Sequence, residues 1–150
     1  MTINPLLGPV VALVAWTLVM LIWMAIVRFS GTKKAGIDIG KSVGGRGQDL
    51  EGRVDGKVNW PAHNYAHLHE QPTIFYAIVL ALVAMGDTAV INLYLAWGYV
   101  ALRIVHSIWQ ATVNQVKVRA PLFLLSALCL LGLTVHAAAR IIHDSGLLSG

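Results

Sequence analysis

Polar side chains that could bind a ligand gather in residues 61–76, at the start of a long apolar run. Asn64, His67 and Glu70 recur at every third residue, with His63 beside them, so a helix would carry them as one stripe. Ionisable groups at membrane depth cost a few kcal/mol each, and they usually persist because they are paired or functional. This stretch is therefore the first candidate for a binding or catalytic site.

A second polar stripe lies further along the chain, inside another apolar run. It consists of Arg103, His106 with Ser107, Gln110 and Asn114, at steps of three and four, which again form one face of a helix. Arg119 follows shortly after this stripe, and we expect all these groups to face a common pocket. The alternative is that the stripes only join helices, at about 0.6–2 kcal/mol per hydrogen bond. Glu70 would then be a buried partner of Arg103.

Metal binding is a further possibility for the first stripe. His63 and His67 at i and i+4, followed by Glu70, have the spacing with which a helix presents two imidazoles to zinc. The zinc-protease motif needs a glutamate directly after the first histidine, however, and position 64 is asparagine. We therefore assign no metal ligands.

Composition indicates the kind of scaffold that must position these groups. The chain has 150 residues, of which 57% are hydrophobic and 12% charged, and a mean hydropathy of +0.68, values typical of integral membrane proteins rather than soluble domains. The net charge of +4 comes mainly from one glycine-rich stretch, which topology explains better than nucleic-acid binding. The single cysteine, Cys129, excludes an internal disulfide.

Four apolar segments are long enough to cross a membrane, at about residues 6–27, 60–85, 88–113 and 120–142. The first lacks the basic start and small-residue cleavage site of a signal peptide, so we expect it to be an uncleaved anchor. Short connections between the later segments favour antiparallel neighbours. The sequence thus predicts an all-α integral membrane protein, an antiparallel four-helix transmembrane bundle forming a single domain over residues 1–150.

The basic residues predict the orientation of this bundle. Residues 28–59 hold eight of the 14 glycines and seven of the 11 Lys and Arg residues, and residues 114–119 hold two more basic residues. By the positive-inside rule these loops are cytoplasmic and both termini lie on the other side, with Arg140 as an exception. We expect a multi-pass protein of a bacterial inner membrane.

The motifs themselves resemble those of a known family. They are Asn64-Tyr-Ala-His67-Leu-His-Glu70-Gln-Pro72-Thr-Ile-Phe75-Tyr, Trp97-Gly-Tyr-Val-Ala-Leu-Arg103-Ile-Val-His106-Ser, Thr112-Val-Asn114, and Arg119. Over residues 60–140 the chain is similar to the MAPEG family (membrane-associated proteins in eicosanoid and glutathione metabolism), particularly its bacterial members. The family pattern has an asparagine three residues before the glutamate and often an arginine four residues earlier. Here those positions are His67 and His63.

The resemblance implies a homotrimer of four-helix bundles that holds glutathione in a cytoplasmic-side cleft between subunits. The residues it implies for glutathione binding are Asn64, His67, Glu70, Arg103, His106, Gln110 and Asn114. Glu70 would receive the ligand's ammonium group or fix an arginine. The polar stripe of the third span contains no tyrosine, so Arg119 is assigned by position as the catalytic group that stabilises the glutathione thiolate.

The function that follows is a membrane-bound glutathione transferase or peroxidase. Its second substrate would be a lipophilic electrophile or hydroperoxide that arrives from the membrane lipids. The alternative is a non-catalytic membrane scaffold or lipid-binding protein that keeps the bundle without the thiol chemistry. His63 and His67, which depart from the family pattern, motivate this alternative.

Overall fold

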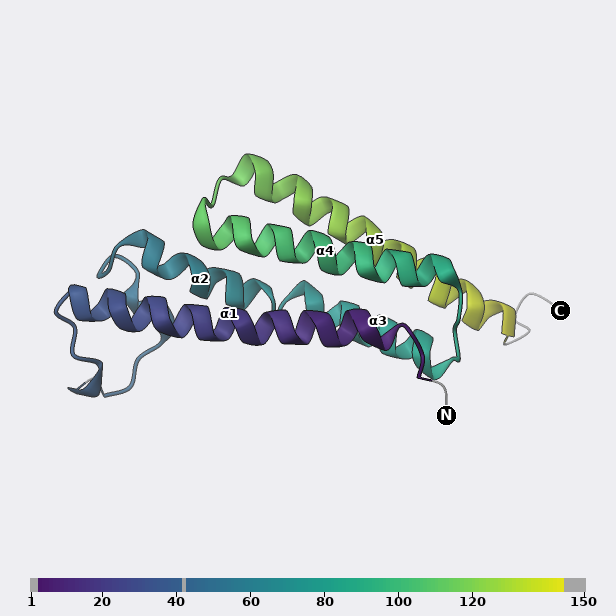
Figure 1. Cartoon of the computed structure of the whole chain (residues 1–150), viewed down its shortest axis with the longest axis horizontal. Helices are drawn as coiled ribbons and strands as arrows, with labels where there is room; N and C mark the ends of the chain where they lie inside the picture. The colour runs from purple at the N-terminus through teal and green to yellow at the C-terminus, as the bar shows by residue number, and fades with distance from the viewer. Residues whose placement is uncertain (1–2, 42, 145–150) are drawn as a thin grey trace.

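The computed structural model describes residues 3–41 and 43–144, and all the regular elements in these ranges are helices. They are α1 (Leu7–Lys34), the short 3-10 helices η1 (Ile39–Lys41) and η2 (Gly47–Leu50), α2 (Gly56–His67), α3 (Gln71–Ala84), α4 (Val90–Thr112) and α5 (Val116–Asp144). The long helices form an elongated antiparallel bundle. The start of α1 and the end of α5 lie at one end of the bundle, and residues 35–41, 43–55 and 113–115 lie at the other (Figure 1). The all-α prediction is confirmed.

Helices α1 and α5 are long and apolar enough to cross a membrane. In their most apolar stretches only 11% and 22% of the residues are buried within the chain. The outer surface of α1 carries large apolar side chains such as Val11, Leu18 and Ile22, each more than half exposed. Soluble monomers rarely expose an apolar face of this extent. The surface therefore suits contact with lipid or with another subunit.

Apolar side chains from four helices fill the centre of the bundle. Leu13 of α1, Val79 of α3 and Leu133 of α5 are completely buried. The rings of Phe75 and Tyr99 stack in nearly parallel planes, with centroids 4.3 Å apart, and so join α3 to α4. Helix α4 packs mainly against α5, whereas α2 packs against α1 and α4. The polar stripe of α4 consequently lies between α2 and α5.

The stretch predicted as one span over residues 60–85 contains two helices, with a break at residues 68–70. Pro72 has no amide hydrogen to donate to the carbonyl of Leu68, and its ring disfavours helical geometry just before it. Glu70 has backbone angles of φ −92° and ψ −97°. Its carbonyl accepts hydrogen bonds from the amide and the hydroxyl of Thr73, at 3.2 and 2.6 Å. Because of the break, the two helices pack against partly different neighbours. Helix α2 contacts α1 and α4, whereas α3 contacts α1 and α5.

Helix α1 continues to Lys34, two turns beyond the apolar segment at residues 6–27. Two residues later comes Gly36, whose positive φ of 69° few other residues adopt and which stops the helix. The amide of Ile37 donates to the carbonyl of Thr32, and the amide of Gly36 donates to that of Lys33, at 3.0 and 3.2 Å. This is a Schellman motif, which satisfies the last carbonyls of the helix. Helices α2 and α5 also begin four residues before the predicted segments, at residues 56 and 116.

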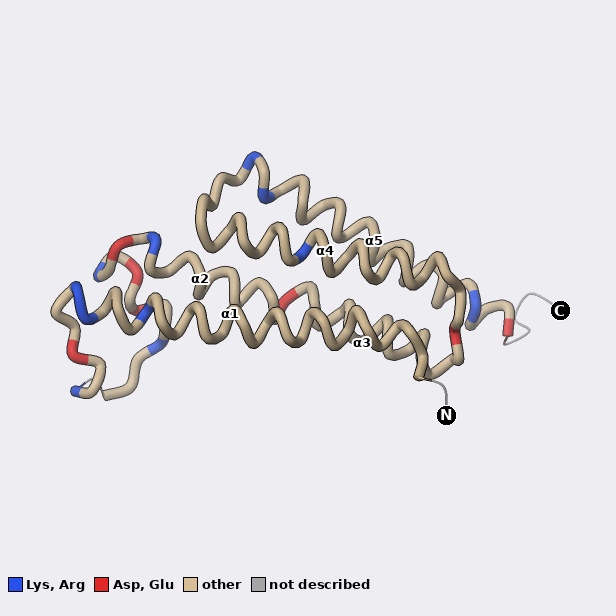
Figure 2. Tube along the Cα trace, viewed as in Figure 1, with Lys and Arg blue, Asp and Glu red and all other residues tan. Residues whose placement is uncertain are grey.

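Charged residues are unevenly distributed along the bundle. Lys and Arg residues gather at the end that holds residues 35–41, 43–55 and 113–115 (Figure 2), which we call the basic end. At the opposite end, Arg140 has its Nη1 atom 3.4 Å from the buried carboxylate of Asp87 and its Nε atom 3.6 Å from Asp144. Arg140, which lies away from the basic end, is thus paired with two nearby carboxylates.

Candidate functional site

Four polar side chains of α4 are buried inside the bundle. Arg103, His106, Ser107 and Gln110 are 1%, 4%, 0% and 1% exposed, respectively. Steps of three and four residues place them on one face of the helix, as the sequence predicts. Buried polar groups usually have hydrogen-bond partners, so the partners of each side chain indicate what it does.

Arg103 is held by aromatic rings. Its Nε atom donates to the hydroxyl of Tyr99 at 3.2 Å, and its guanidinium carbon lies 5.6 Å from the Tyr99 ring and 5.1 Å from the Phe123 ring. The Tyr99 hydroxyl in turn lies 3.5 Å from Oε1 of Gln71. Within the described part of the chain, the Nη2 atom of Arg103 is buried without a hydrogen-bond partner, and no carboxylate forms an ion pair with Arg103. A cationic group with an unused donor is suited to bind an anion.

Glu70 is not the buried partner of Arg103. Its side chain is 64% exposed, and its Oε2 atom lies 3.0 Å from Nδ1 of His67. The break between α2 and α3 removes Glu70 from the stripe that a continuous helix would have formed. One turn earlier on α2, His63 makes a similar pair with Glu51 at 2.8 Å. Both histidines that depart from the family pattern therefore contact carboxylates near the surface.

Ser107 connects three helices. Its hydroxyl accepts hydrogen bonds from Nδ2 of Asn64, at 2.5 Å, and from Nε1 of Trp16, at 2.9 Å. These donors belong to α2 and α1, respectively. Asn64 is 1% exposed, so its amide group lies in a helix interface. For Asn64 the alternative of interhelical hydrogen bonding thus has direct geometric support.

A small cleft lies where α2, α4 and α5 meet near the basic end. It has a volume of about 240 Å³ and is lined by His67, His106, Val116, Arg119, Ala120 and Phe123. The rings of His67 and His106 are 6.3 Å apart. Nη1 of Arg119 donates to Oδ1 of Asn114 at 2.6 Å. Asn114 has a positive φ of 59° at the end of α4, a conformation that asparagine tolerates better than most residues.

The structure brings together part of the predicted set. His67, His106 and Arg119 line the cleft directly, and Arg103 reaches the ring of Phe123, which also lines it. Asn114 contacts the cleft through Arg119. Gln110 is buried, and its Oε1 atom has no partner among the described residues.

Tyr99 and Trp16 are among the residues around the site that were absent from the sequence prediction. Tyr99 precedes Arg103 by one turn on the same face of α4 and hydrogen-bonds to it, so the polar stripe does include a tyrosine. The i, i+4 spacing of Tyr99 and Arg103 could have revealed it. Trp16 is 91 residues away from Ser107 in the sequence, and no local pattern signals that contact.

His63 and His67 of α2 each contact a different carboxylate and do not gather around one point. Across residues 3–41 and 43–144, no group of three or more His, Cys, Asp or Glu side chains has the geometry to hold a metal ion. His63 and His67 point to different carboxylates, Glu51 and Glu70.

Comparison with known proteins shows the family of this chain. A model of the MAPEG family matches residues 6–139, which include α1 to α4 and most of α5. No curated protein and no solved structure gives a significant match. The family match covers nearly the whole chain, including both polar stripes and Arg119. The chain therefore belongs to the MAPEG family, whose members are membrane-associated and include glutathione transferases.

Proposed function

We propose that this protein is a membrane-bound enzyme that uses glutathione as co-substrate, as a transferase or a peroxidase for lipophilic electrophiles or hydroperoxides. The family generally uses glutathione. The observation that carries the proposal is the buried guanidinium of Arg103, whose Nη2 atom has no partner among the described residues. A buried charge is costly unless it is compensated. A carboxylate of glutathione would provide that compensation.

Different residues of the predicted site would bind different groups of this anionic tripeptide. Arg103, His106 and Gln110 would bind a carboxylate inside the bundle, Glu70 would receive the ammonium group near the surface, and Asn64, His67 and Asn114 would position neighbouring groups. The cleft of about 240 Å³ would hold one part of the tripeptide. The remainder would contact a neighbouring subunit of a homotrimer.

Arg119 would stabilise the reactive form of the sulfur. The glutathione thiol is mostly protonated at neutral pH, and a positive charge nearby lowers the pKa of a thiol. The hydrogen bond from Nη1 to Asn114 fixes the guanidinium, while its other N–H groups stay available to the thiolate. In conjugation, the thiolate forms a bond to an electrophilic carbon, and the leaving group departs with the bonding electrons.

Peroxide reduction would use the same thiolate. Sulfur attacks one peroxide oxygen, the O–O bond breaks, and the alkoxide takes a proton to become an alcohol. A second glutathione thiolate then displaces hydroxide from the glutathione sulfenic acid, giving glutathione disulfide and water after protonation. In either reaction the apolar substrate would enter laterally from the lipid.

Glutathione binding by the protein in lipid nanodiscs, measured by calorimetry, tests the proposal. We expect Arg103→Gln to lower the affinity about 10- to 100-fold, since a hydrogen bond to a charged group contributes about 1.5–3 kcal/mol. Arg140→Gln is the matched control, because Arg140 pairs with Asp87 at the opposite end of the bundle. Absence of binding to the unmodified protein, or equal losses in the two variants, would contradict the proposal.

A non-catalytic scaffold or lipid-binding protein is the second candidate. One observation favours it, namely that His67 lies 3.0 Å from the carboxylate of Glu70, which would otherwise receive the glutathione ammonium group. If this pair blocks the site, His67→Asn should increase glutathione affinity without changing thermal stability. Loss of an existing glutathione-dependent turnover in the same variant would count against this candidate.

We also propose that the four helical passes span a bacterial inner membrane with the basic end in the cytoplasm. The gathering of Lys and Arg residues at that end (Figure 2) supports this orientation by the positive-inside rule. Reporter fusions at the two termini should both give a periplasmic signal. A cytoplasmic signal from either terminus would refute the assignment.

A further inference from the structure

The last turns of α1 reach beyond the apolar core of a membrane. Its 28 residues extend about 42 Å at 1.5 Å per residue, whereas the hydrocarbon core is about 30 Å thick. Counted from Leu7, Phe29 lies about 33 Å and Lys33 about 39 Å along the helix. Both residues would therefore lie at the level of the lipid headgroups. This placement rests on the proposed membrane span and is independent of the glutathione chemistry.

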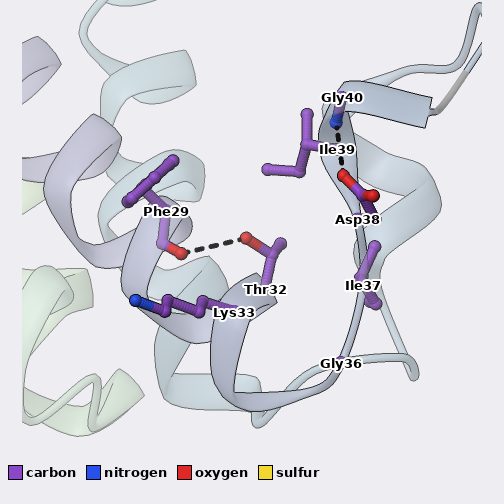
Figure 3. Close-up of a pocket in the computed structure, with 8 residues that line it drawn as sticks. All are labelled: Phe29, Thr32, Lys33, Gly36, Ile37, Asp38, Ile39 and Gly40. Carbon is purple, nitrogen blue, oxygen red and sulfur yellow. Dashed lines mark hydrogen bonds between the residues drawn. The ribbon is translucent and has the colours of Figure 1, made fainter.

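A pocket of about 320 Å³ opens at this level, between the end of α1 and residues 36–40. Phe29 and Ile39 stand on opposite sides of it, and Lys33 extends beside Phe29 (Figure 3). Phe29 is 69% exposed and Ile39 50% exposed, although both are large and apolar. The pocket thus combines apolar walls with an amino group at its rim.

The charges around the pocket favour an anion. Asp38 is the one carboxylate among the residues that line it. Its Oδ1 atom accepts a hydrogen bond from the amide of Gly40 at 3.0 Å, and its Oδ2 atom lies 3.6 Å from the ammonium group of Lys41. The negative charge of Asp38 is therefore compensated. Lys33 lies in the last turn of α1, where a positive charge is also favoured by the helix dipole.

We propose that this pocket binds one anionic phospholipid of the surrounding leaflet. The lipid phosphate would contact the ammonium group of Lys33, and the first methylene groups of an acyl chain would pack between Phe29 and Ile39. Such a lipid would cover apolar surface that otherwise faces water at the membrane boundary. It would also connect the end of α1 to the glycine-rich loop.

Lys34 provides a matched control for Lys33. Both residues lie in the last turn of α1 and both are exposed. Lys34 faces different cavities, which Asp55 and Val58 also line. General attraction between a basic surface and anionic lipid would depend equally on both residues, whereas a defined lipid site would depend on Lys33 alone.

The test counts lipids retained by the full-length protein after purification from vesicles of phosphatidylglycerol and phosphatidylcholine, by native mass spectrometry. We expect the unmodified protein to retain phosphatidylglycerol preferentially. Lys33→Gln should lower this retention about fivefold, equivalent to the ~1 kcal/mol that a lysine near an anionic surface contributes. Lys34→Gln should change it less than twofold. Ile39→Ser should also lower retention while helical circular dichroism stays unchanged.

Three results would overturn the proposal. Equal losses in the two lysine variants would show a general charge effect, and equal retention of both lipids would show an apolar surface without headgroup preference. Displacement of the lipid by free glycerol 3-phosphate would show a phosphate site that needs no acyl chain. Since retention is measured without glutathione, failure here leaves the proposed enzyme activity untouched.

Discussion

Replacing Ser107 with alanine removes the acceptor that connects α1, α2 and α4. The hydroxyl is completely buried and accepts hydrogen bonds from Asn64 and Trp16 at 2.5 and 2.9 Å. Without it the amide of Asn64, which is 1% exposed, would be left buried without this acceptor, and the half-buried indole N–H of Trp16 would lose its partner. An unsatisfied buried donor costs about 1–3 kcal/mol in soluble proteins, and hydrogen bonds between membrane helices contribute about 0.6–2 kcal/mol. For two bonds in this interface we expect a loss of about 1–3 kcal/mol of unfolding free energy.

Ser126→Ala is the control for this loss. Ser126 is also completely buried, but its hydroxyl donates to the carbonyl of Phe123 within the same helix, at 2.7 Å. That carbonyl can keep a backbone partner when the hydroxyl is removed. The variant should therefore lose less than about 1 kcal/mol.

Reversible unfolding in mixed micelles with increasing sodium dodecyl sulfate, followed by tryptophan fluorescence, measures both variants. A double-mutant cycle with Asn64→Ala isolates the bond between Asn64 and Ser107, because residues in contact show non-additive losses. Equal destabilisation by the two serine variants, or additive losses in the cycle, would refute the inference that Ser107 joins the helices.

Three further predictions follow from other contacts. Asp87→Ala should lower the unfolding free energy by at least ~2 kcal/mol, because the buried carboxylate accepts from the Ala89 amide at 2.8 Å and pairs with Arg140; an unchanged unfolding midpoint would contradict this. Gly31→Ala should destabilise the protein by about 1–3 kcal/mol, because the added methyl carbon would lie 2.5 Å from Val58. A second substitution, Val58→Ala, should restore the stability if that overlap is the cause. Arg119→Ala should shift the ultraviolet absorbance of the bound glutathione thiolate to higher pH and reduce turnover more than tenfold. An unaltered kcat would exclude Arg119 from thiolate stabilisation.

The alignment of the polar residues of α4 on one face could be predicted, because it follows from their spacing in the sequence. Arg103, His106 and Gln110 recur at steps of three and four, and any helix through them must place them on one face. Apolar residues surround them in the sequence, so that face had to point inward. The structure adds that the face includes Tyr99, one turn earlier.

The α2 side could not be predicted in the same way, because it depends on a helix break. Residues 68–70 themselves contain no glycine or proline. The signal for the break is Pro72, whose missing amide hydrogen acts further back in the helix, and the prediction of one span over residues 60–85 did not use it. A continuous helix would have aligned Asn64 with Glu70. In the structure Asn64 faces Ser107 inside the bundle while Glu70 is largely exposed. Contacts between distant segments, such as that of Trp16 with Ser107, depend on packing that no local pattern encodes.

The network around Asp87 also bears on the order in which the chain assembles during synthesis. Asp87 first meets donors from its own hairpin, the amide of Ala89 and Nδ2 of Asn92, at 2.8 and 3.1 Å. The carboxylate of the hairpin of α3 and α4 is therefore partly satisfied before α5 is present. Arg140, and His136, whose Nδ1 atom lies 2.6 Å from Oδ1 of Asn92, are synthesised later with α5. The last helix thus brings the countercharge, so completion of α5 fixes a hairpin that was synthesised before it.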